Sequence, residues 1–325
     1  MDEAFVIDKE TFLPGDQGLV KVSVSRLPSG TPISIKCHVF RSVNPGPSLL
    51  ILAGVHGDEI NGIELVRRTL EDGIYDNLLK GSVIVVPLLN IYGFINFSRE
   101  VPDGKDVNRS FPGSMKGSLA SRVAATLTKK ILPLVDIAID CHTGGASRYN
   151  YPQVRYSRKD ERAKQLANAF GAPFSIQKAI ISKSFRKTAN EMGTSTLVYE
   201  AGESERLCGL SILTGYHGIQ RVLKSLGMLE SAPPLSDDVL HVERTGWVRA
   251  SEAGIFIWSQ QSGKHIAKGE ILGTIHSPQG DRFRKVISRN SGHIIGHNNA
   301  SVVNSGDALF HLAYDAKPEE SPELP

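Results

Sequence analysis

The stretch that most constrains the fold is an apolar run at residues 48–53 that stops at Gly54. A short apolar run that ends in glycine is typical of a buried strand leading into a tight turn. Over residues 60–70, apolar side chains then recur at the spacing of one helix face. The chain is therefore expected to place a buried strand, a turn and a helix here, the start of a β-α-β unit.

The turn between this strand and helix holds two side chains that can bind a metal. His56 and Glu59 lie three positions apart, so an imidazole nitrogen and a carboxylate can reach one point, a combination that suits zinc. The same residues also fit an ordinary helix start, with Asp58 and Glu59 near the positive end of the helix dipole. The pair alone leaves both interpretations open, and a third ligand would favour the metal.

Three further apolar runs predict that the first strand belongs to a parallel sheet. The run at 82–88 follows the helix, and the runs at 134–142 and 196–200 come later. A strand, a helix and a second strand of this kind form a right-handed β-α-β unit. The ligand site of such a sheet lies beyond the carboxyl ends of its strands. The last two runs end in His142 and Glu200, so we expect both side chains at the same rim as the first turn.

The residues gathered at this rim have the composition of a catalytic zinc site. His56, Glu59 and His142 would supply two imidazoles and one carboxylate, which leaves a fourth position for water. Glu200 would act beside that water as a general base and then as a general acid. Asp140 precedes His142 by two residues on the same strand face, and it either accepts the second imidazole N–H or caps the strand end.

The chain changes character after residue 230. Residues 1–230 alternate strands with helices, and the patterns within 1–45 predict an antiparallel β edge. Residues 231–239 have the Pro, Ser and Asp content of a linker. Residues 240–316 show short strands and a repeated glycine-centred unit, which predicts a small all-β sandwich or barrel, and 317–325 form a tail. We therefore expect an α/β catalytic domain followed by a smaller C-terminal β domain.

Composition argues against several classes of partner. The 325 residues are 40% hydrophobic and 22% charged with a net charge of +3, as in globular proteins. Lysine and arginine form no block, so nothing favours nucleic acid or a membrane surface as a partner. No apolar run has the length of a membrane span, and the first residues are acidic where a signal peptide is basic. Three widely spaced cysteines form no Cys-x-x-Cys pair, so we expect a reduced, cytoplasmic setting.

Four blocks, in this order, resemble the succinylglutamate desuccinylase/aspartoacylase family of the zinc carboxypeptidase-like clan. They are Gly-Val-His-Gly-Asp-Glu at 54–59, Asp-Val-Asn-Arg-Ser-Phe-Pro-Gly at 106–113, Asp-Cys-His-Thr-Gly at 140–144, and the strand that ends in Glu200. The resemblance covers roughly residues 45–230. It implies a zinc-carboxypeptidase-like fold, with a mixed, largely parallel sheet flanked by helices.

The resemblance also implies roles for residues at the rim. His56, Glu59 and His142 would hold one zinc ion per chain, and Glu200 would be the base. It further implies a small-molecule substrate that carries a free carboxylate.

Four polar residues before Glu200 acquire expected roles in the same way. The resemblance implies that Asn108 and Arg109 grip the substrate carboxylate, and a planar guanidinium can do this with two parallel hydrogen bonds. Arg99 would help to polarise the scissile carbonyl, in a loop somewhat longer than that of the aspartoacylases. Arg186 is a candidate for binding a second acidic group. Where aspartoacylases place their specificity arginine, this chain has Asn190, which argues against a dicarboxylate substrate.

The expected function is zinc-dependent hydrolysis of the amide bond of an N-acyl amino acid or a related small amide, by metal-activated water. Two alternatives stay open: a metallocarboxypeptidase acting on a peptide tail, and a non-catalytic ligand-binding relative. The presence of Glu200 argues against the second, because a degenerate site would lose its base. A homo-oligomer is compatible with the sequence, which leaves the acyl group, the amine and the physiological metal open.

Overall fold

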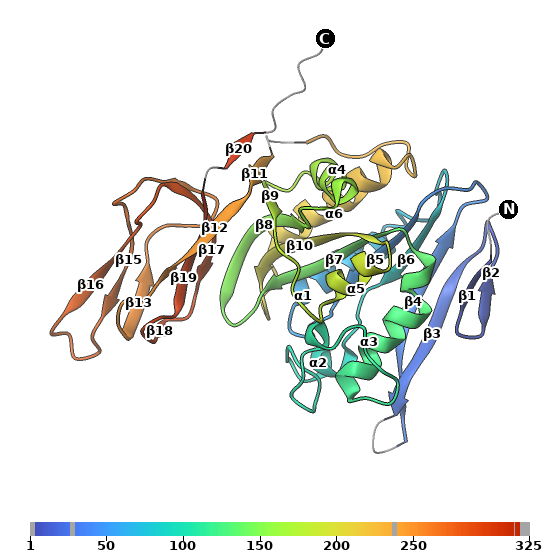
Figure 1. The fold of residues 1–325 in the computed structure, drawn as a ribbon, viewed down its shortest axis with the longest axis horizontal. Helices are drawn as coiled ribbons and strands as arrows, with labels where there is room; N and C mark the ends of the chain where they lie inside the picture. The colour runs from blue at the N-terminus through green and yellow to red at the C-terminus, as the bar shows by residue number, and fades with distance from the viewer. Residues whose placement is uncertain (1–3, 27–29, 236–238, 315, 319–325) are drawn as a thin grey trace, which may run out of the picture.

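The computed structural model describes residues 4–26, 30–235, 239–314 and 316–318. Its largest feature is a mixed sheet in which ten strands follow one another in the order β12-β19-β17-β8-β10-β7-β5-β6-β4-β3 (Figure 1). The predicted linker residues 236–238 and the predicted tail from residue 319 onward lie outside the described residues.

The centre of the sheet is parallel, which confirms the predicted β-α-β arrangement. The central strands are β5 (Ser48–Ala53), β6 (Ser82–Val86), β7 (Ile137–Gly144) and β10 (Ser195–Glu203). β5 pairs in parallel with β6 and β7, and β7 pairs in parallel with β10. Their carboxyl ends therefore meet at one rim, where a ligand site is expected.

Antiparallel strands flank this centre on both sides. They are β3 (Gln17–Arg26), β4 (Pro32–Arg41) and β8 (Arg148–Tyr156). The short strand β9 (Phe174–Gln177) pairs in parallel with β8, and β1 (Phe5–Ile7) and β2 (Glu10–Phe12) form a separate two-stranded sheet. β3 and β4 form the predicted antiparallel edge, and β4 continues onto β6. β8 pairs antiparallel with β10 on the opposite side. The sheet is therefore mixed, as the sequence predicts.

Helices cover both faces of the sheet and bury two separate cores. They are α1 (Ile60–Glu71), α2 (Ile91–Ile95), η1 (Val107–Arg109), α3 (Leu119–Lys130), η2 (Leu132–Leu134), α4 (Glu161–Phe170), α5 (Phe185–Glu191) and α6 (Gly209–Ser225). Leu50 and Leu52 of β5 pack into the core that contains α3 and α5, whereas Leu49 and Ile51 pack into the core that contains α1, α4 and α6. This two-sided burial explains why the strand is apolar throughout. No described helix is both long enough and apolar enough to cross a membrane.

The last helix of this region starts later than the sequence predicts. The spacing of apolar residues predicts a helix over residues 205–226 with Cys208 in its core. That start is wrong, because α6 begins at Gly209 and Cys208 is its half-exposed N-cap residue. Glu205 has a positive φ, and its backbone N–H donates to the Asp58 carbonyl at 2.8 Å. The Cys208 N–H donates to the Asn61 side chain at 2.7 Å. These bonds hold the segment against the first turn and delay the helix.

The C-terminal region is all-β, as predicted, and forms a sandwich of two layers (Figure 1). Its strands are β11 (Leu240–Val242), β12 (Arg244–Arg249), β13 (Gly254–Trp258), β14 (His265–Ile266), β15 (Ile271–His276), β16 (Phe283–Ile287), β17 (Gly292–Asn298), β18 (Val302–Val303), β19 (Ala308–Tyr314) and β20 (Lys317–Pro318). One layer is the sheet β16-β15-β13-β18. The other layer extends the large sheet, because β17 pairs antiparallel with β8. The domain boundary near residue 230 stays a prediction.

The turn between β5 and α1 fits closely against α2. Gly57 donates its backbone N–H to the Ser98 carbonyl at 3.1 Å. A Cβ atom added at Gly57 would lie 1.9 Å from the Gly93 carbonyl carbon and 2.0 Å from the Phe94 nitrogen. Both neighbours are backbone atoms and cannot rotate away. Glycine is therefore required at this position by space.

We predict that Gly57→Ala lowers the free energy of unfolding by about 1–3 kcal/mol, the usual scale for an overpacked interior. Denaturant unfolding would measure the change. Gly209→Ala is the matched control, because nothing lies within 4 Å of a Cβ at that glycine. Equal stabilities for the two variants would contradict the steric argument.

Candidate active site

One pocket of about 130 Å³ at the rim of the sheet contains every residue that the sequence singles out for chemistry. Its walls come from the first turn, the loop before η1, the ends of β7 and β10, β8, and the segment that leads into α5. The lining residues are His56, Glu59, Arg99, Asn108, Arg109, Asp140, His142, Thr143, Arg155, Ile181, Ser184, Arg186, Val198 and Glu200.

Three buried side chains in this pocket could hold a metal ion. His56, Glu59 and His142 are 2%, 2% and 5% exposed, and their ligand atoms all lie within 4.8 Å of one another. The Nδ1 atom of His56 is 2.7 Å from Glu59 Oε1, and the Nδ1 atom of His142 is 2.8 Å from Glu59 Oε2. The helix-start interpretation does not account for this geometry, because Glu59 makes no capping bond to α1.

The ionisable side chains in this cluster shift one another's pKa values. Burial alone would raise the pKa of Glu59, but His56 and His142 hold that pKa well below its usual range. Burial alone would lower the pKa of His142, but Asp140 and Glu59 raise it well above its usual value. The Glu59 carboxylate and the imidazole protons of this group thus stabilise one another. A divalent cation would replace those protons, and two nitrogens with one carboxylate are donors that suit zinc.

The second nitrogen of each imidazole faces another carboxylate. His142 Nε2 is 2.9 Å from Asp140 Oδ2, and His56 Nε2 is 3.2 Å from Asp106 Oδ1. Such partners fix the orientation of a ligating ring. For Asp140 this geometry favours the imidazole partner over the strand-end cap. Sequence reasoning missed Asp106 in this role, although it opens the block at 106–113.

Arg99 lies beside the three candidate ligands. Its guanidinium donates to Glu59 Oε1 at 3.2 Å and to Asp106 Oδ2 at 3.2 and 3.0 Å. Burial lowers the pKa of Arg99, but Glu59 and Asp106 outweigh this and raise it. These two carboxylates hold its charge beside the three candidate ligands.

Asn108 and Arg109 lie at the mouth of the pocket. The Asn108 side-chain oxygen accepts the Phe185 N–H at 2.8 Å, which ties η1 to the start of α5. Arg109 is exposed and donates to the Asn108 carbonyl at 2.7 Å. Among the described residues no carboxylate pairs with Arg109, so most of its guanidinium is free to bind an anion.

Glu200 is held by two neighbours on β8. Asn150 Nδ2 donates to its Oε2 at 2.8 Å, and Arg155 Nη1 donates to its Oε1 at 2.9 Å. In the strand ladder, Glu200 lies directly opposite His142. Sequence reasoning found Glu200 but neither partner. The alternation of tyrosine with polar residues at the start of β8 is the signal in the sequence that indicates a strand here.

Arg186 is buried in the wall of the same pocket, with 7% of its surface exposed. Its Nη2 donates to the Ala179 carbonyl at 2.7 Å, whereas its buried Nη1 has no hydrogen-bond partner among the described residues. Burial, together with the nearby Arg155, lowers the pKa of this guanidinium. Arg186 therefore lines the pocket and carries one donor that is unused among the described residues.

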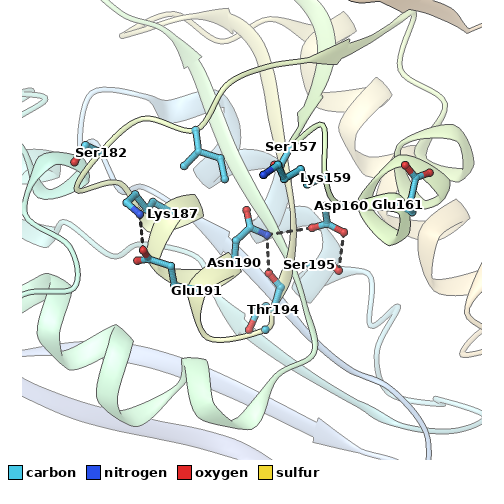
Figure 2. Close-up of a pocket in the computed structure, with 12 residues that line it drawn as sticks. Ser157, Lys159, Asp160, Glu161, Ser182, Lys187, Asn190, Glu191, Thr194 and Ser195 are labelled. Carbon is cyan, nitrogen blue, oxygen red and sulfur yellow. Dashed lines mark hydrogen bonds and ion pairs between the residues drawn. The ribbon is translucent and has the colours of Figure 1, made fainter.

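A larger hollow, of about 580 Å³, lies between α5 and the start of α4 (Figure 2). Its polar residues largely bind one another. Lys187 pairs with Glu191, and Asp160 accepts from Asn190 at 3.1 Å and from Ser195 at 2.9 Å (Figure 2). It holds none of the metal-binding group, so the smaller pocket is the candidate active site.

Comparison with known proteins identifies similar families and relatives. The family described as Succinylglutamate desuccinylase/Aspartoacylase catalytic domain matches residues 45–226. N-alpha-acetyl-L-2,4-diaminobutyric acid deacetylase of Halomonas elongata is 25% identical over 282 residues, 82% of each protein.

Two solved structures are similar over nearly the whole chain. A succinylglutamate desuccinylase/aspartoacylase from Rhodobacter sphaeroides has a TM-score of 0.81 at 26% identity, covering 94% of this chain and 96% of that one. The product-bound ectoine utilization protein EutE (DoeB) from Ruegeria pomeroyi has a TM-score of 0.81 at 25% identity, covering 93% and 97%.

We predict that His142→Ala loses zinc affinity. Losing a residue that only orients a metal ligand typically costs roughly 10–100-fold, and the loss of a ligand itself should cost more. Metal analysis after dialysis would measure zinc per chain, and circular dichroism would verify folding. The exposed His265, changed to Ala, serves as the control. Unchanged zinc stoichiometry in a folded His142→Ala protein would refute the ligand assignment.

Proposed function

Since the chain belongs to the succinylglutamate desuccinylase/aspartoacylase family, we propose that it is a zinc-dependent hydrolase that cleaves the amide bond of an N-acyl amino acid. The observation that carries this proposal is the buried His56–Glu59–His142 group in one pocket with Glu200. The relative that acts on an N-acetylated amino acid supports it.

The three buried ligands define what the ion would contribute. His56, Glu59 and His142 would hold the zinc, which, when bound, polarises a carbonyl and lowers the pKa of water. Arg99 donates toward the same point through Nη1, which lies 3.2 Å from Glu59 Oε1. It stabilises the negative charge that develops on the carbonyl oxygen as the amide is attacked.

Glu200 carries the proton transfers. Its carboxylate takes a proton from the attacking water, and the water oxygen forms a bond to the amide carbon. The protonated Glu200 then gives this proton to the leaving nitrogen as the C–N bond breaks. The products are a free amine and a carboxylic acid, which releases its remaining proton to solvent and becomes a carboxylate, and Glu200 ends in its starting state.

The arginines at the pocket select an anionic substrate. Arg109 and Asn108 bind the carboxylate of the amino acid, a role that the free guanidinium of Arg109 supports. Arg186 offers its unpartnered Nη1 to a second acceptor on the substrate. A pocket of about 130 Å³ suits a small molecule better than a peptide tail, which favours deacylation over carboxypeptidase action.

We predict that Glu200→Gln binds zinc normally and loses at least about 10²-fold in rate, the scale of a general acid–base group. The amide keeps the shape of the side chain, and the Asn150 amide can rotate to present its oxygen to it. Amine release from N-acyl amino acids and zinc content are the measurements.

The exposed Glu161, changed to Gln, is the control for Glu200→Gln. If zinc affinity fell together with rate, Glu200 would be a metal ligand. If the rate persisted, it would be a structural cap.

A second prediction concerns Arg109, which we propose binds the carboxylate of the substrate together with Asn108. Arg109→Lys keeps the charge but loses the planar fork, so turnover of an N-acyl amino acid should fall by about tenfold or more, since hydrogen bonds to charged groups contribute about 1.5–3 kcal/mol. An analogue with an amidated carboxylate should lose much less. Rates with both substrates decide the matter, and equal losses would show that Arg109 does not bind the carboxylate.

A further inference from the structure

We propose that Arg155 is a positioning residue for Glu200, and that strand β17 of the C-terminal region holds Arg155 in place through Gln153. This inference rests on the proposed function, because it takes Glu200 as the base. It makes the C-terminal sandwich part of the catalytic apparatus.

Arg155 grips two groups with one planar guanidinium. Nη1 donates to Glu200 Oε1 at 2.9 Å, while Nε and Nη2 both donate to Gln153 Oε1 at 3.1 Å. Because these N–H groups belong to one planar guanidinium, they fix the distance between the Gln153 amide and the Glu200 carboxylate. Because the fork is rigid, a lysine cannot make both contacts at once.

Gln153 in turn is fixed by the C-terminal region. Its side chain is fully buried, and its Nε2 donates to the Ile295 carbonyl of β17 at 3.0 Å and to the Tyr151 carbonyl at 3.1 Å. Its amide oxygen is occupied by Arg155. A buried amide with all these bonds made has one orientation, so β17 sets the position of Arg155.

The second partner of Glu200 is also supported by β17. Asn150 lies opposite Gly296 in the β17–β8 ladder. A Cβ atom at Gly296 would lie 2.9 Å from the Tyr149 carbonyl oxygen and 3.1 Å from Asn150 Oδ1. β17 thus packs closely against Asn150. Both oxygens of Glu200 therefore accept hydrogen bonds from side chains, those of Asn150 and Arg155, whose positions depend on β17.

Several of the ionisable groups near Arg155 are basic, and Glu200 is the acidic group that pairs with it. Lys178, Arg186 and His311 lie near enough to Arg155 for its charge to lower their pKa values, in each case after the larger effect of burial. Among the described residues, Glu200 is the carboxylate that forms an ion pair with Arg155. Removing Arg155 would leave Glu200 Oε1 without this donor, so that Asn150 alone would hold the carboxylate, through Oε2.

The test compares Arg155→Gln, Arg155→Lys and Gln153→Leu in the full-length, zinc-loaded protein, with the exposed Arg158→Gln as control. Arg155→Gln should lower kcat by about 10²-fold, the cost of a small misplacement of a reacting group, and leave zinc content unchanged. KM should change little, and added guanidinium ion should restore part of kcat. Arg155→Lys and Gln153→Leu should fall between this variant and the wild type. The control should match the wild type.

A second readout does not depend on turnover. In a crystal structure of Gln153→Leu, the Glu200 carboxylate should leave the position that it shares with Arg155 and Asn150. A kcat for Arg155→Gln within twofold of wild type, or an unmoved Glu200 in Gln153→Leu, would overturn the inference. A wild-type protein that releases no amine would refute the proposed function instead, and the crystal structure would still decide the positioning role.

Discussion

The Glu59 carboxylate is almost completely buried, and the rest of the site supplies the donors that this burial requires. Burying an isolated ion costs on the order of several kcal/mol even after relaxation. Glu59 recovers this through two imidazoles, the Thr143 N–H at 3.0 Å and Arg99. These partners come from the first turn, from β7 and from the loop before η1. One carboxylate therefore fixes the mutual positions of three segments that are distant in sequence.

A second layer of contacts acts on Glu200 in a comparable way but from the other side. The parallel strands β7 and β10 bring His142 and Glu200 to the same rim, which is a consequence of strand direction alone. The orientation of the Glu200 side chain is set by antiparallel neighbours, since Asn150 and Arg155 both lie on β8. Parallel strands thus determine which residues meet, and antiparallel strands determine how one of them points.

The sequence predicts the first of these two levels and misses the second. Apolar runs that end in His142 or Glu200 are local signals, and the rule for parallel sheets converts them into a shared rim. The partners Asn150 and Arg155 could not be assigned, because their contacts depend on which strands lie side by side. The contact of Asp106 depends on how the loop before η1 packs against His56. The predicted start of α6 is wrong for a related reason. The spacing of apolar residues continues through Cys208, but hydrogen bonds to distant residues hold that segment in a turn.

The pairing of β17 with β8 also has a mechanical consequence. A C-terminal region joined to the catalytic part only by a linker could swing aside as a hinged lid. Here such a swing would have to break the ladder that runs between Gly296 and Asn150. The mouth of the pocket, where the exposed Ile181 and Arg109 lie, is thus built on a continuous sheet and is not opened by a hinge between the two regions.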